Sequence, residues 1–167
     1  MVVSPTRGTI AITLSWANRK FGMFYAQRMD VPETPAALRE EYDTQLEDIL
    51  ETATFDAQDT VSVAETTVVI GDVVSRFEEK SSDLSLEDAA VIQSLEDGEP
   101  DPDTIVEIAC EHLLLGMTTA VLDVDTLASE LETDLDAKEV QQKIERRAPM
   151  TFDEYVHVQH AIVSRSR

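Results

Sequence analysis

The sequence has little of what disulfide frameworks, turn-rich β folds and aromatic cores require. Its 167 residues include one cysteine, five glycines and six prolines, and only 5% of them are aromatic. The single cysteine, Cys110, cannot form an internal disulfide, which indicates a reducing compartment. Few glycines and prolines leave few turn signals and favour helices. We therefore expect a cytoplasmic, all-α protein, a compact multi-helix bundle whose core rests on Leu, Val, Ile and Ala.

The patterns of catalytic and metal sites are also missing. The chain has no glycine-rich phosphate loop, no nucleophile elbow and no Cys-x-x-Cys pair. His157 and His160 are three residues apart, and two histidines are half a zinc site. No carboxylate is bracketed by residues that would shift its pKa. We expect no enzymatic activity, no catalytic residues, no cofactor, no metal and no membrane span.

Basic residues are scarce and acidic residues abundant. The chain holds 34 Asp and Glu against 13 Lys and Arg, for a net charge of −21. After residue 29 the acids lie in every segment between apolar residues, which indicates a solvated acidic shell rather than an acidic binding tail. At molar salt the Debye length is about 3 Å, so such a shell is screened. This charge pattern is typical of a halophilic archaeon, and we predict that origin.

Residues 1–29 differ from the rest of the chain, because they hold four bases and no acid. Three interpretations are open. The start is assigned too far upstream and Met23 or Met29 is the true first residue, or the segment is a basic arm that contacts nucleic acid, or it is a weak targeting signal behind Arg7. We favour the first and expect a disordered basic extension over residues 1–29.

Apolar residues at helical spacing predict the remaining elements. Thr34 before Pro35 and the pairs Ser85–Asp88, Asp136–Glu139 and Thr151–Glu154 are N-capping patterns. Helices are expected over residues 35–52, 59–66, 70–79, 85–96, 103–117, 125–132, 137–147 and 151–164. Gly98 and two prolines divide the chain into an N-terminal helical unit over 30–99 and a C-terminal helix-turn-helix-like unit over 100–167.

The C-terminal unit carries a spaced set of residues that points to a known family. The set is Leu127, Ala128, Leu131, Val140, Ile144, Glu145, Thr151, Phe152, Tyr155, Val158 and Ile162. Through these residues the stretch 103–164 resembles the Cro/CI-type helix-turn-helix family. The resemblance implies that helix 137–147 enters the major groove of duplex DNA. From about residue 35 the chain also looks like an uncharacterised haloarchaeal protein family, which adds no mechanism.

A degenerate second copy of this unit is expected over residues 59–96. Both copies read as short helix, loop, capping residue and helix, so a tandem repeat of two units would account for the chain length. With one gap, residues of the two copies line up in order: Val73, Phe77, Leu84, Ser85, Leu86, Asp88 and Ile92 with Val140, Ile144, Met150, Thr151, Phe152, Glu154 and Val158.

Acidic residues become scarce, and basic residues more frequent, near the C-terminus. Residues 30–137 hold 30 acids and 3 bases, whereas residues 138–167 hold 4 acids and 6 bases. Glutamine pairs with adenine in the major groove, and lysine or arginine pairs with guanine or phosphate. The predicted DNA contacts are Gln141 and Gln142 to base edges, and Lys138, Arg146 and Arg147 to the backbone.

These residues leave two functions open. The first is a helix-turn-helix regulator that binds duplex DNA, as a homodimer, through helix 137–147. The second is a non-enzymatic helical adaptor that binds another protein through the same helices. Burial of Gln141 and Gln142 against another helix would favour the adaptor. Arg146 and Arg147 also have a purely structural explanation, since cations complement a helix C-terminus. We interpret the apolar run 113–117 as part of the core, and a dimer or partner surface is the second interpretation.

Overall fold

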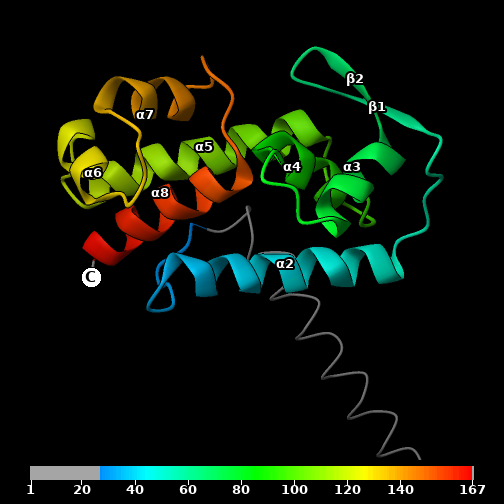
Figure 1. Cartoon of the computed structure of the whole chain (residues 1–167), viewed down its shortest axis with the longest axis horizontal. Helices are drawn as coiled ribbons and strands as arrows, with labels where there is room; N and C mark the ends of the chain where they lie inside the picture. Colours follow the sequence, from blue (N-terminus) through cyan, green and yellow to red (C-terminus); the bar gives the residue numbers. More distant parts are fainter. Residues whose placement is uncertain (1–26, 167) are drawn as a thin grey trace, which may run out of the picture.

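The computed structural model describes residues 27–166 (Figure 1). Helices predominate among these residues, and one small antiparallel sheet accompanies them. The predicted helical class is therefore confirmed in its main feature. The elements, labelled as in Figure 1, are α2 (Pro35–Thr52), β1 (Thr60–Val63), β2 (Thr66–Val69), α3 (Ile70–Glu78), α4 (Leu86–Ser94), α5 (Pro102–Thr119), α6 (Val124–Glu130), α7 (Ala137–Ile144) and α8 (Phe152–Arg165).

Helix α4 lies at the centre of the molecule and packs against α2, α3, α5 and α8. Its residues from Leu86 to Gln93 are almost all buried. The buried apolar side chains form one core cluster that runs across the expected boundary between residues 99 and 100. Figure 1 shows α3 and the hairpin at one end of the molecule and α6 and α7 at the other.

The expectation of a helix over residues 59–66 is wrong, because this segment forms most of a β-hairpin. Strands β1 and β2 pair antiparallel, with Val63 opposite Thr66. Ala64 and Glu65 form the two-residue turn with φ angles of 52° and 61°, the backbone that matches the twist of a hairpin. β-Branched residues dominate both strands, and their stiff side chains favour the extended backbone.

Side-chain caps begin the helices where the sequence predicts them. Thr34 Oγ1 accepts a hydrogen bond from the Ala37 N–H. Ser85, Asp136 and Thr151 each form a complete capping box with the acid three residues later. The three predicted boxes are thus confirmed. They satisfy backbone N–H groups that have no partner within the helix.

The loops before α4 and α8 lie side by side. Ser85 and Thr151, which occupy corresponding positions in the predicted repeat, form an isolated antiparallel bridge. Two backbone bonds join the loops, with N···O distances of 3.0 and 2.8 Å: Leu86 to Met150 and Phe152 to Leu84. The two helices that follow these loops are therefore fixed to each other at their N-termini.

Arg28, which lies in the basic segment, packs against the helices. Its guanidinium carbon is 5.5 Å from the centroid of the Tyr42 ring, and its Nη2 is 2.6 Å from Glu41 Oε1. A chain that begins at Met29 would lack both contacts. The rest of the basic segment, residues 1–26, lies outside the described residues.

Two buried glutamines occupy corresponding positions of α4 and α8. Gln159 is 5% exposed, accepts a hydrogen bond from the Tyr42 hydroxyl, and donates one to the Tyr155 hydroxyl with an Nε2···Oη distance of 3.2 Å. Gln93 is fully buried, and neither polar atom of its side chain has a partner among the described residues.

The two glutamines are therefore expected to respond oppositely to the same substitution. Gln93→Met should raise the free energy of unfolding by about 1–3 kcal/mol, because a buried amide without a hydrogen bond is destabilising. Gln159→Met should lower it by about 1–3 kcal/mol, because two tyrosine hydroxyls lose their partner. Methionine and glutamine have similar helix propensities. Urea denaturation measures both, and a loss of stability in Gln93→Met would contradict the expectation.

Candidate functional site

Helix α7 is shorter than the predicted recognition helix. It spans Ala137–Ile144 rather than 137–147. Arg146 has a φ of 62°, and the Arg147 N–H donates back to Gln142 O over 2.7 Å. This is a helix-ending pattern in which glycine is usual, and a proline follows shortly after it. Arg146 and Arg147 thus lie in the turn after α7 and not in its last turn.

Acids of the same chain neutralise two of the three predicted phosphate contacts. Arg146 Nη2 is 3.3 Å from Asp103 Oδ1, and Arg147 pairs with Glu145. Lys138 is exposed and has no ion pair among the described residues. Internal pairing therefore leaves little free positive charge on this side of α7.

The two predicted base contacts are not buried against another helix. Gln141 is exposed, and its Nε2 lies 3.4 Å from Glu145 Oε2. Gln142 is half-buried. The burial that would exclude contact with DNA bases is absent at both of these described residues.

At each of the two paired loops, a basic side chain of the helix before the loop pairs with an acid of the helix after it. Arg76 binds Asp88 with two nitrogen–oxygen contacts of 2.9 and 3.1 Å. Lys143 Nζ lies 2.9 Å from Glu154 Oε1 and 2.7 Å from Pro149 O. Asp88 and Glu154 are also the acids of the capping boxes. Lys143 is therefore part of the fold rather than available to a phosphate.

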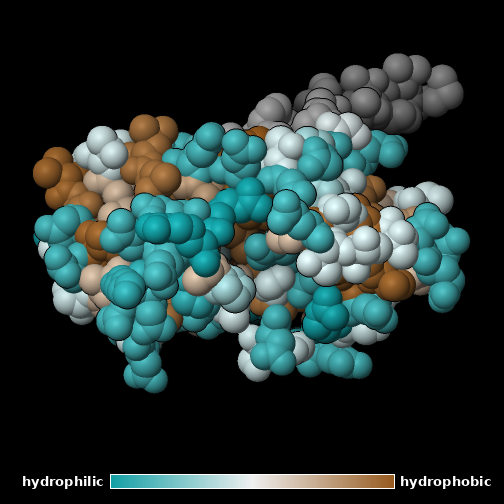
Figure 2. Space-filling view, turned by 90° about the horizontal axis from the view of Figure 1, so that it is seen from above, coloured by the Kyte–Doolittle hydropathy of each residue, from teal (hydrophilic) through white to brown (hydrophobic). Residues whose placement is uncertain are grey.

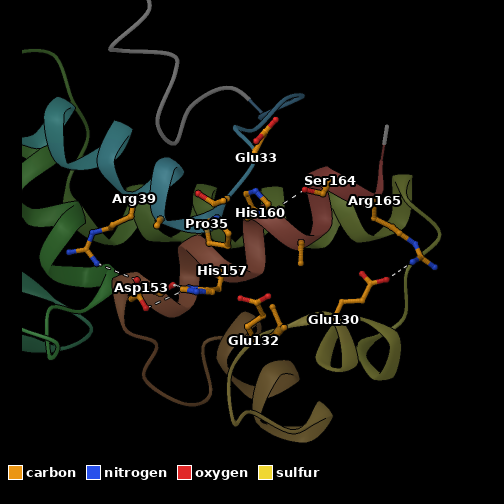
Figure 3. A pocket seen from close by; sticks show the side chains of 14 residues that line it. Glu33, Pro35, Arg39, Glu130, Glu132, Asp153, His157, His160, Ser164 and Arg165 are labelled. Carbon is orange, nitrogen blue, oxygen red and sulfur yellow. Dashed lines mark hydrogen bonds and ion pairs between the residues drawn. The ribbon is translucent and has the colours of Figure 1, made fainter.

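An open groove of about 740 Å³ lies between the start of α2, one face of α8 and the segment that follows α6 (Figure 3). Four small or apolar residues contribute to its lining: Pro35, Ala36, Leu131 and Ala161. Its volume is in the range of ligand pockets, roughly 300–1,000 Å³. Because the groove is open to solvent, its shape suits a segment of another chain better than an enclosed small molecule.

Ion pairs fix the two ends of the groove, as Figure 3 shows. At one end, Asp153 Oδ1 is 3.7 Å from Arg39 Nη1 and Asp153 Oδ2 is 3.5 Å from His157 Nδ1. At the other end, Arg165 pairs with Glu130. The charges at both ends are thus largely balanced within the chain.

Glu33 and Glu132 supply the remaining charge of the groove. Both are exposed, and neither has an ion-pair partner among residues 27–166. Figure 3 shows them on either side of the histidine rings. A partly apolar lining with two free carboxylates suits a segment that carries both apolar and cationic side chains.

Two of the three histidines of the chain line this groove in defined orientations. His157 Nδ1 is 2.8 Å from Asp153 O, and His160 Nε2 is 2.8 Å from Pro32 O. A carbonyl oxygen only accepts, so these two nitrogens carry the protons. The bonds hold the rings in place and leave His157 Nε2 without a protein partner among the described residues.

Cys110 lines a smaller pocket of about 250 Å³ together with Glu87 and Arg146. Burial raises the pKa of the Cys110 thiol to about 11, and burial also raises the pKa of Glu87. A thiol with a raised pKa is a poor nucleophile at neutral pH. This pocket therefore has the properties of packing rather than of a cysteine active site.

Local sequence patterns do not reveal the groove, because its walls come from three separate segments, near residues 33–39, 130–132 and 153–165. His157 and His160 were the available signal, but two histidines three residues apart are only half a zinc site and do not indicate a groove. Among the described residues, no group of three or more His, Cys, Asp or Glu is arranged to hold a metal ion.

Within residues 27–166, no single helix has both the length and the apolar character of a membrane span. Helices α5 and α6 reach these criteria only when they are taken together, and a bend of 101° separates them.

The described chain is thus a mostly helical protein with one hairpin and an acid-rimmed groove. Residues 38–165 match a family of unknown function, DUF5791, and the chain belongs to this family. Comparison with curated proteins and with solved structures finds no match.

Proposed function

We propose that this chain is a non-enzymatic, cytoplasmic interaction module that binds a basic segment of another protein in the groove between α2 and α8. The observation that carries the proposal is the free charge of Glu33 and Glu132 beside a partly apolar lining. Apolar side chains of the partner lose contact with water in the groove, and its lysines or arginines approach the two carboxylates.

The ion pairs at the ends of the groove support this proposal. Arg39 contacts Asp43 with an Nε···Oδ1 distance of 2.9 Å as well as Asp153, and its guanidinium lies 4.9 Å from the centroid of the Phe152 ring. Side chains that are already held in place lose little conformational entropy when a partner binds.

A fluorescently labelled amphipathic helical peptide, with lysines on one face and leucines on the other, tests the proposal by fluorescence anisotropy. Glu33→Lys with Glu132→Lys is expected to weaken its binding at least about tenfold, because each partner cation then meets a like charge. Glu65→Lys with Glu107→Lys is the matched control, since it changes the net charge equally on exposed sites outside the groove.

The histidines provide a second readout. On peptide binding, the ring resonances of His157 and His160 are expected to shift, whereas those of His112, which does not line the groove, keep their positions. Equal losses of affinity in the two double variants would overturn the proposal, because they would mean that the peptide is attracted only by the net charge.

Duplex DNA binding through α7 is the alternative proposal, and the exposure of Gln141 and Lys138 favours it. It predicts sequence-specific retention of genomic fragments in molar KCl that is lost when Gln141, Gln142 and Arg146 are replaced by alanine. The groove proposal predicts that this triple variant binds the peptide as the natural chain does. Retention that is absent in the natural chain would rule out the DNA alternative.

A further inference from the structure

An uncharged surface lies at the C-terminal end of α5. The stretch from His112 to Leu122 contains no Asp, Glu, Lys or Arg. Among the described residues, four large apolar side chains are exposed, and three of them lie here: Leu114 at 45%, Leu115 at 50% and Val121 at 91%. Figure 2 shows apolar surface gathered at the end of the molecule where α5 runs into α6. We call Leu114, Leu115, Met117 and Val121 the α5 patch.

The α5 patch has the shape of a contact surface. A shallow hollow of about 540 Å³ runs along it, lined by Leu114, Met117, Thr118, Val121, Leu122 and Asp123. Such a hollow has room for apolar side chains of another molecule. Contiguous apolar surface of this kind marks interaction sites more often than scattered exposed residues do.

The backbone of Val121 is strained in addition. Val121 has a φ of 52°, and the Leu122 N–H donates to Met117 O over 2.9 Å. This is the helix-ending motif in which glycine is usual. A β-branched residue at positive φ is an outlier, because its Cβ crowds the backbone. In the single chain, Val121 is therefore both strained and almost fully exposed.

Two other helices of this chain end in the same way with different side chains. Lys80 after α3 has a φ of 56° and Arg146 after α7 has a φ of 62°. Both carry a charged side chain: Lys80 is exposed to water, and Arg146 pairs with Asp103. Val121, at the corresponding place after α5, gains neither solvation of a charge nor an ion pair. Backbone strain that no local interaction offsets is a mark of functional positions.

We propose that the α5 patch is a dimer interface and that its occupant is a second copy of this chain. Two copies that each carry −21 repel one another. They approach closely only over a surface without acids, and the stretch 112–122 provides one. At a two-fold axis each patch meets its own copy, so no like charges face each other at the centre. A cationic partner, in contrast, is drawn to carboxylates rather than to a neutral patch.

The acids beside the patch predict how the dimer responds to salt. Glu111 and Asp123 are exposed at the two ends of the uncharged stretch. Their repulsion across the interface is screened as salt rises. The dimer is therefore expected to tighten with salt, whereas attraction of a cationic segment to Glu33 and Glu132 weakens with salt. The two surfaces are distinguishable by the sign of this dependence.

Sedimentation equilibrium of the full chain at low and at molar KCl tests the proposal. The natural chain is expected to form a reversible dimer that is tighter at high salt. Leu114→Ser is expected to weaken it at least about tenfold through lost apolar burial. Val121→Gly is expected to weaken it about tenfold as well, and to raise the urea midpoint of the dilute monomer because the strain is relieved.

Lys80→Gly is the matched control. It relieves the same backbone strain after α3, so it should raise the urea midpoint and leave the dimer constant unchanged. A chain that stays monomeric at every salt concentration would overturn the proposal, as would Val121→Gly dimers as tight as those of the natural chain.

Discussion

Raising the pH from about 9 to 12 is expected to unfold the chain cooperatively, because buried phenols and a buried thiol resist ionisation. Burial raises the pKa of Tyr42 from 10.0 to about 12, and burial raises the pKa of Tyr155 well above 10.0. Tyr42 and Tyr155 are 0% and 1% exposed. The folded chain keeps protons that the unfolded chain releases, so its stability falls as the pH rises through this window.

The size of the effect follows from the raised pKa values. Tyr42 contributes a loss of about 3 kcal/mol between pH 10 and pH 12. Tyr155 adds a loss of the same sign, and the thiol of Cys110, with its pKa raised to about 11, adds another from pH 9 upward. A domain is stable by only about 5–15 kcal/mol. The alkaline transition should therefore come before the phenols ionise in the folded state.

Urea denaturation at a series of pH values measures this dependence, with phenolate absorbance followed in parallel. Tyr42→Phe is the control: it loses the hydrogen bond to Gln159, and its stability should fall less steeply with pH. If phenolate absorbance reached its full rise near pH 10 while the helical circular dichroism stayed constant, the tyrosines would be ionising in the folded chain and the expectation would be contradicted.

Phe152→Ala is expected to lower the free energy of unfolding by about 3–5 kcal/mol, the range for a fully buried phenylalanine. Phe152 is 0% exposed, and its ring centroid is 5.8 Å from that of Tyr42 and 6.2 Å from that of Tyr155. It also begins α8 at the bridge between the two loops. Its loss opens a cavity between α2 and α8 where three aromatic rings meet.

Phe152→Leu is the matched control, because it keeps an apolar side chain in the same place and should be destabilising by a smaller amount. Leu86, at the corresponding position of α4, is 1% exposed, and Leu86→Ala should lower the free energy of unfolding by about 2–5 kcal/mol. Urea denaturation compares the three variants. A loss of only about 1 kcal/mol in Phe152→Ala would mean that the site collapses around the missing ring.

Capping residues and helical periodicity predicted most of the helices. The helix expected over residues 59–66 was wrong because the turn residues of the hairpin gave no signal. The capping boxes at Ser85, Asp136 and Thr151 involve neighbours in the sequence, so local reasoning finds them. The hairpin turn at Ala64 and Glu65 has neither Gly nor Asn, the residues that normally mark positive φ. Without a turn signal, the sequence pattern predicts a helix over residues 59–66 where the hairpin lies.

The candidate site was harder to predict, because it depends on contacts between distant residues. The basic residues after position 137 form a cluster in the sequence, but their acidic partners lie elsewhere: Arg146 pairs with Asp103 and Lys143 with Glu154. Net charge along a chain does not show which charges are already paired.

The ion pairs of Arg76 and Lys143 have a consequence for how the chain depends on its solvent. At each loop, a basic side chain of the preceding helix, Arg76 of α3 or Lys143 of α7, is the counter-ion of the acid that caps the following helix. Partly buried pairs are screened far less than exposed charges. The charge balance at the junction of the two loops therefore responds less to dissolved salt than the repulsion among the exposed acids, which salt screens.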